Sequence, residues 1–207
     1  MNESQKAPRG RSREATRAKL LDAAAEVFAE VGLGEASVER ICERAGFTRG
    51  AFYSNFGSKD EMFLELATVV ARGRVAAVRA RIDEVSVECD EPDVTVIIRA
   101  LDVVGDDRLT TMLMNEINIH AMRDREFAAA YRAQIDEVTA EIVQLIDEVT
   151  ENKCLRLRLP SADAARIIMG VWGDISSRAA IAGLSPEAMA EQRTHELGQI
   201  IDLVLER

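Results

Sequence analysis

The sequence is poor in the residues that mark disulfide-rich and metal-binding proteins. It has three cysteines and two histidines among 207 residues, and Cys42, Cys89 and Cys154 lie far apart. An odd number of isolated cysteines, without a CxxC or Cys/His pair at zinc-ligand spacing, argues against a disulfide framework and against a zinc site. We therefore expect reduced thiols in a cytoplasmic protein, with no metal ion and no other cofactor.

Long apolar runs, prolines and aromatic residues are also scarce. The richest apolar stretch spans 167–172, far short of the ~20 residues that a membrane-spanning helix needs. The N-terminal sequence MNESQKAPRGRSR has no apolar core, so we expect no secretion signal. With four prolines, 4% aromatic residues and abundant alanine, leucine, glutamate and arginine, the composition favours an all-α chain.

The formal net charge of −10 disfavours a polyanionic partner only if the charge is evenly spread, and it is not. Residues 1–63 carry ten basic and ten acidic side chains, whereas residues 64–207 carry sixteen basic and twenty-six acidic ones. The first twenty residues alone carry six basic and two acidic side chains. The basic N-terminal arm at their start either follows DNA or is a disordered tail. The asymmetry predicts two parts with different partners, the acidic part repelling nucleic acid.

Apolar residues recur at helical spacing along the chain, with capping residues and glycines between the segments. The pattern predicts helices over 12–31, 38–45, 49–55, 59–83, 93–104, 107–121, 124–151, 161–182 and 186–206, and no strand. The short helices over 38–45 and 49–55 are joined by a turn with Gly46, as in a helix-turn-helix. We expect a basic flexible arm over 1–11, a helix-turn-helix domain over 12–57, a long connecting helix over 58–83 and a helical body over 84–207.

The helix predicted over 49–55 carries side chains suited to the major groove of DNA. Arg49 can donate two hydrogen bonds to guanine or bind a phosphate. Gly50 and Ala51 are small enough for the backbone to approach the bases, and Tyr53, with its hydroxyl, can reach a phosphate. Asn55 and Lys59 add an amide and an ammonium group for phosphate or base edges.

The residues that begin the two short helices have two possible roles. Ser37 and Thr48 are either helix caps only, or caps that also contact phosphate. Phe47, Phe52 and Phe56 are expected in the core rather than at the surface. The predicted DNA-contacting residues are Ser37, Thr48, Arg49, Gly50, Ala51, Tyr53, Asn55 and Lys59.

Three consecutive segments carry a family pattern: LLDAAAEVFAEVG over 20–32, SVERICERAGFTRGAFYSNF over 37–56 and GSKDEMF over 57–63. The pattern resembles the TetR (tetracycline-repressor-like) family of bacterial transcription regulators, whereas the rest of the chain is similar only in helix order and length. The resemblance implies a DNA-binding domain followed by an effector-binding and dimerisation domain over 84–207. It also implies that, of the residues above, all except Thr48 occupy positions that commonly touch DNA. The sequence departs from common family forms at Ser54 and Asn55.

The resemblance further implies a homodimer and a ligand pocket. The last two helices would form the dimer interface, through Ile168, Val171, Ile175, Leu197, Ile201, Val204 and Leu205; the alternative is packing within one subunit. The pocket would take a largely apolar effector between the predicted fifth and eighth helices. It would be lined by Met112, Asn115, Ile119, His120, Phe127, Tyr131, Met169 and Trp172, each of which can instead be plain core.

These expectations combine into a repressor that binds a palindromic operator as a homodimer and is released by a small molecule. An enzyme is not expected, because there are only two histidines, no suggestive Ser/His/Asp order and no glycine-rich phosphate loop. Glu116, His120 and Asp124 are spaced along one helix face, but without a second histidine nearby we predict no metal site. The alternative function is a helical interaction or ligand-binding module without specific DNA binding.

Overall fold

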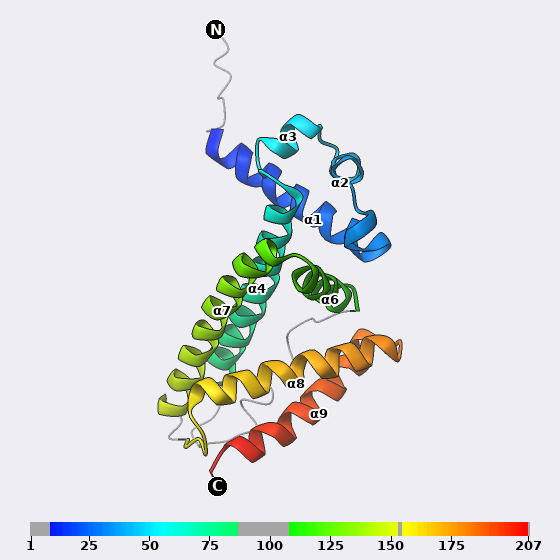
Figure 1. The fold of residues 1–207 in the computed structure, drawn as a ribbon. Helices are drawn as coiled ribbons and strands as arrows, with labels where there is room; N and C mark the ends of the chain where they lie inside the picture. Colours follow the sequence, from blue (N-terminus) through cyan, green and yellow to red (C-terminus); the bar gives the residue numbers. More distant parts are fainter. Residues whose placement is uncertain (1–8, 87–107, 153–154, 207) are drawn as a thin grey trace.

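The computed structural model describes residues 9–86, 108–152 and 155–206, and this part of the chain is almost entirely helical (Figure 1). The helices are α1 (Arg9–Glu35), α2 (Val38–Ala45), α3 (Arg49–Tyr53), α4 (Lys59–Ser86), α6 (Arg108–Arg123), α7 (Arg125–Asn152), α8 (Ser161–Ile181) and α9 (Pro186–Val204). No strand occurs within the described ranges, where only an isolated bridge joins Leu157 to Leu205. The all-α prediction is confirmed, and the helix predicted over 93–104 lies outside the described residues.

Most predicted helix ends lie within a few residues of the observed ones, because local capping signals fix them. Ser185 accepts a hydrogen bond from the backbone N–H of Ala188, and Pro186 occupies the first position of α9. The start of α1 is an exception: it begins at Arg9 rather than at Ser12, so the end of the expected flexible arm is helical. Gly32 interrupts α1 with a positive φ of 75°, close to the predicted stop.

The helices form an elongated molecule with the helix-turn-helix at one end (Figure 1). Helices α1, α2 and α3 lie at the top of that view, and α8 and α9 pack against each other at the opposite end. The long α4 runs from the first group toward the second, with α7 packed alongside it. Helix α4 therefore runs between the two ends of the molecule.

One cluster of buried side chains joins the helix-turn-helix to the neighbouring part of the body. Phe28 of α1 meets Phe63 of α4 edge-on, with ring centroids 4.5 Å apart. The same cluster includes Ile117 of α6 and Phe127 of α7. A separate buried cluster lies between α8 and α9. Among the described residues, every helix is too short or too polar to cross a lipid bilayer.

Candidate functional site

Local signals shape the turn between α2 and α3. The Ser37 hydroxyl accepts a hydrogen bond from the backbone N–H three residues on, at 3.2 Å, and caps α2. Gly46 ends α2 with a left-handed conformation, φ 71°. Thr48 caps α3 in the same way as Ser37 caps α2, also at 3.2 Å. Both residues are therefore caps, and both are exposed at the surface.

Aromatic anchors fix which side of α3 faces outward. Phe52 and Phe56 are fully buried, with ring centroids 5.6 Å apart, which confirms their predicted place in the core. Because these side chains point into the domain, Arg49, Gly50 and Tyr53 are left on the outer side. The Tyr53 side chain is half exposed although it is large and aromatic.

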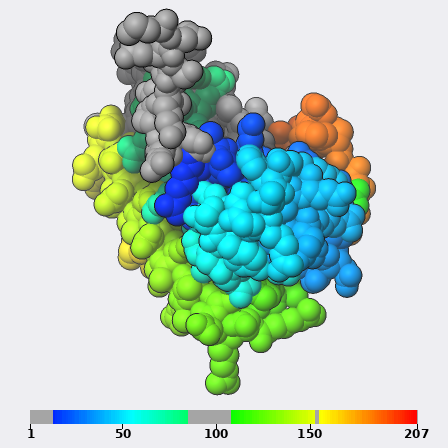
Figure 2. Space-filling model, turned by 90° about the horizontal axis from the view of Figure 1, so that it is seen from above, coloured from blue at the N-terminus to red at the C-terminus, as the bar shows by residue number. Residues whose placement is uncertain are grey.

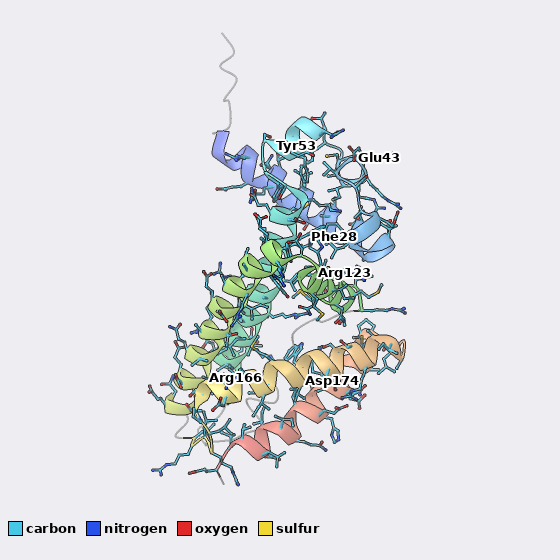
Figure 3. All side chains as sticks on the ribbon, viewed as in Figure 1. Phe28, Glu43, Tyr53, Arg123, Arg166 and Asp174 are labelled. Atoms are coloured by element: carbon cyan, nitrogen blue, oxygen red, sulfur yellow. The ribbon has the colours of Figure 1, made fainter. Side chains whose placement is uncertain are left out.

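Five of the eight predicted DNA-contacting residues are exposed on α2 and α3 or at their caps. Figure 2 looks onto this end of the molecule, where α3 (cyan) and α2 (blue) form one continuous surface. Figure 3 shows Tyr53 on this side of α3. Ala51 is partly buried. The exposed residues are Ser37, Thr48, Arg49, Gly50 and Tyr53, and their contact with DNA stays a prediction.

The other two predicted contacts, Asn55 and Lys59, face the protein and need correction. Asn55 is 6% exposed, and its amide donates to the backbone oxygen of Ala51 at 2.7 Å. The Lys59 ammonium donates to the backbone oxygens of Leu33 and Ala36, each at 3.1 Å. The Lys59 ammonium satisfies backbone carbonyl groups at and just after the end of α1, and the Asn55 amide satisfies one in α3. Both side chains therefore stabilise the fold instead of presenting hydrogen-bond donors to a ligand.

Most basic side chains of this end are held by acidic neighbours. Arg17 of α1 forms ion pairs with Glu61 and Glu65 of α4 and lies over the Phe56 ring, 4.2 Å from its centroid. The hydrogen bonds with Glu65 raise the pKa of the Arg17 guanidinium above its usual value. Arg44 of α2 is paired with two glutamates of α1. These basic residues tie helices together, a role that sequence reasoning missed because the partners are far apart along the chain.

Arg49 is paired differently. Its Nη1 lies 2.9 Å from Oε1 of Glu39, in the first turn of α2. Both side chains are more than half exposed, so the pair lies on the outer surface of the two short helices. Because Glu39 is acidic, this surface holds little uncompensated positive charge.

The body contains an apolar cavity of about 250 Å³ between α4, α7, α8 and α9. Of the described residues that line it, Arg74 alone is charged. The rest are mostly aliphatic and include Val75, Val78, Ile142, Leu145, Ile168, Met169, Trp172 and Ile201. Sequence reasoning placed the pocket between the predicted fifth and eighth helices and named Phe127 and Tyr131 of α7, but it named no residue of α4 and none of the α7 residues that line this cavity.

Only Met169 and Trp172 of the eight predicted ligand-binding residues line this cavity. Phe127 and Tyr131 are buried in the cluster shared with the helix-turn-helix, where burial raises the pKa of the Tyr131 hydroxyl. Met112 and Ile119 are 38% and 41% exposed on α6. Asn115 and His120 make their hydrogen bonds to Ser177 and Asp60. The prediction named mainly α6 residues, whereas this cavity is lined by α4, α7, α8 and α9; which residues bind a ligand stays a prediction.

The acidic and histidine side chains of α6 have separate structural partners. Glu116 accepts a hydrogen bond from the backbone N–H of Leu33 at 3.3 Å. The His120 Nε2 lies 3.0 Å from Oδ1 of Asp60, and its ring packs edge-on against Phe127. Asp124 caps α7. Within the described residues, no group of three or more His, Cys, Asp and Glu side chains is arranged to hold a metal ion.

The predicted dimer contacts also need correction. Ile175, Leu197, Ile201, Val204 and Leu205 are at most 5% exposed within a single chain, four of them in the cluster between α8 and α9. Ile168 and Val171 pack against the same cluster. The alternative of packing within one subunit therefore holds for the five buried residues, whereas Ile168 and Val171 are only partly buried and their contact with a partner subunit stays a prediction. The exposed apolar side chains at this end are Ile167 and Ile181 of α8 and Leu203 of α9.

Comparison with known proteins agrees with the geometry of the first helices. Residues 20–66 match the family model described as bacterial regulatory proteins, tetR family. This segment is thus similar to the TetR family. The regulator SrpR of Pseudomonas putida is 45% identical over 49 residues, which are 24% of this chain and 23% of that protein. The repressor AcnR of Corynebacterium efficiens is 35% identical over 78 residues, 33% of this chain and 42% of that protein. The chain thus spans less than half of each relative.

Solved structures extend the likeness of fold to nearly the whole chain. A TetR-family regulator from Rhodococcus sp. superposes with a TM-score of 0.73 at 18% identity, covering 93% of this chain and all of that one. The fatty acid degradation regulator FadR from Bacillus halodurans gives a TM-score of 0.71 at 17% identity, over 94% and 97% of the two chains. These values show a TetR-type fold.

Proposed function

We propose that this chain is a DNA-binding transcriptional repressor that binds a palindromic operator as a homodimer and is released by a small apolar molecule. The observation that carries the proposal is the exposed surface of α2 and α3. The side chains of Arg49 and Tyr53 and the backbone at Gly50 are exposed, while buried phenylalanines hold α3 in place. An α-helix presented in this way fits the major groove.

The dimer supports operator recognition because two reading surfaces are needed for two half-sites. We place the dimer surface on the outward side of α8, which carries Ile167, Gly170 and Ile181 at helical spacing. The division into arm, helix-turn-helix, connecting helix and effector body is part of the same proposal, with the body supplying both the dimer surface and the cavity.

Helix α4 offers a physical route from the cavity to the DNA-binding end. Its first turn is held to α1 by the Lys59 ammonium, whereas its second half lines the cavity through Val75, Val78 and Ile82. A ligand that shifts α4 therefore shifts the attachment of α1, α2 and α3 as well. DNA and ligand are then negatively coupled, and the coupling is reciprocal.

Selection from a pool of randomised DNA duplexes, followed by binding titrations at several salt concentrations, tests the function. We expect a two-fold symmetric sequence to be enriched, and affinity to fall with salt by about 0.9 log units per log unit of salt for each neutralised phosphate. Binding without sequence preference, or no binding at low salt, would support the alternative of a helical ligand-binding module.

Filling the cavity should remove apolar ligand binding without unfolding the protein. Gly173 of α8 lines the cavity, and a Cβ built on it meets no atom within 4 Å, so Gly173→Phe places a ring in open space. With the fluorescent probe N-phenyl-1-naphthylamine we expect affinity to fall by roughly tenfold, since ring and probe compete for one apolar volume. Ala162→Phe is the matched control, because Ala162 is exposed on α8 outside the cavity lining. Equal probe affinity in both variants would place the binding site elsewhere.

A further inference from the structure

The arginine at the start of α3 is joined to an acidic residue of the preceding helix. Arg49 Nη1 and Glu39 Oε1 are 2.9 Å apart, and the two side chains are 61% and 57% exposed. An ion pair with this exposure adds little to stability, because water screens it and two long side chains lose freedom. Its position therefore needs an explanation other than holding the fold together.

The other ion pairs of this end have a structural role that the Glu39–Arg49 pair does not share. Arg44 joins α2 to α1, and Arg17 joins α1 to the first turns of α4. Glu39 and Arg49 instead bridge α2 and α3 on the surface that we propose faces DNA. The pair thus involves the residue best suited to read a base, rather than a residue between packed helices.

The chemistry of the pair leaves Arg49 able to bind guanine. The ion pair engages Nη1, so Nε and Nη2 remain as two parallel donors, the geometry that guanine O6 and N7 accept. Holding the guanidinium before binding reduces the rotamer freedom that is lost on DNA. The carboxylate also repels phosphates, but this lowers affinity for every sequence alike and leaves the preference for one base pair unchanged, so specificity must come from the position of Arg49.

We propose that Glu39 is a specificity-determining residue that positions Arg49 to read guanine at one base pair of each operator half-site. The proposal rests on the proposed function. It adds that the base recognised is guanine and that Glu39 holds Arg49 in position to recognise it. Glu39 acts through Arg49 and is a positioning residue.

Operator variants with each of the four base pairs at every half-site position test the proposal by fluorescence anisotropy. The unmodified protein should prefer G·C at one position by on the order of tenfold. Glu39→Gln, which removes the charge and keeps the side-chain shape, should lower that preference by roughly threefold or more and leave preferences at other positions unchanged. Glu43→Gln is the matched control, since it removes the same charge from α2 one helical turn further on, and it should keep the full preference.

The double variant Glu39→Gln/Arg49→Ala should show the same base preferences as Arg49→Ala, because two residues that act as a unit are not additive. The proposal is overturned if Glu39→Gln raises affinity for all sequences equally, as Glu43→Gln does, since Glu39 would then be only a nearby negative charge. A melting temperature equal to that of the unmodified protein shows that the variants are folded. Absence of any sequence preference in the unmodified protein overturns the proposed function instead.

Discussion

Replacing Phe28 by alanine is expected to lower the free energy of unfolding by about 3–5 kcal/mol, because a fully buried aromatic side chain leaves a cavity in a packed core. Phe28, labelled in Figure 3, is 1% exposed. Its ring meets that of Phe63 edge-on, with centroids 4.5 Å apart. Such a loss is a large fraction of the 5–15 kcal/mol that typically stabilises a protein. Few single substitutions in the described part of the chain should have a larger effect.

The shared core predicts how the Phe28→Ala protein unfolds. The cluster around Phe28 continues through Ile117 of α6 to Phe127 of α7, so the helix-turn-helix and the adjoining body should lose structure together. Trp172 is the single tryptophan and lies on α8, so its fluorescence reports on the body, whereas far-UV circular dichroism reports on all helices. We expect the two signals to change at the same urea concentration, lower than in the unmodified protein.

Tyr53→Ala is the control for the loss of an aromatic ring. Tyr53 is half exposed on α3, so its removal should change the unfolding free energy by less than about 0.5–1 kcal/mol. Trp172 packs against the separate cluster between α8 and α9. If its environment unfolds at a higher urea concentration than the helices in Phe28→Ala, the two clusters are not coupled and the expectation of a single transition is wrong.

The fold was largely predictable because its signals are local. Ser37, Gly46 and Thr48 fix the short helices through contacts within a few residues of the chain. The buried positions of Phe52 and Phe56 follow from their spacing in the same way. These interactions need no knowledge of distant segments, so periodicity and capping rules suffice.

The predictions that did not match the structure concern contacts between segments that are distant along the chain. From its place at the start of a helix, Lys59 is predicted to be an exposed cation. Its ammonium instead binds the backbone oxygens of Ala36 and Leu33, which precede it by 23 and 26 positions. Periodicity predicts that Leu197 and Ile201 face inward, but it does not say whether they meet the same chain or a partner. The position of the cavity was hard to predict for the same reason. In the sequence, an apolar stripe that lines a cavity has the same spacing as one that packs against another helix.

Arg49→Ala is expected to weaken operator binding by about 2–6 kcal/mol in the homodimer, because each half-site loses a base contact worth ~1–3 kcal/mol. The loss should concern one base pair per half-site, so that the variant binds all four base pairs there with similar affinity. A base-reading arginine and a phosphate-binding arginine differ in one measurable respect. Loss of a phosphate contact lowers the salt slope by about 1 per site, whereas loss of a base contact mainly relaxes specificity.

Arg132→Ala provides the matched control for charge, since Arg132 is an exposed arginine of α7, outside α2 and α3. It should leave operator affinity and specificity unchanged, and both variants should retain the oligomeric state of the unmodified protein in light scattering. If Arg49→Ala binds the selected operator as tightly as the control does, Arg49 is not part of the interface and the pairing with Glu39 has no role in recognition. If affinity falls equally for all sequences and the salt slope decreases, Arg49 binds phosphate, and specificity must come from Tyr53 and the backbone around Gly50.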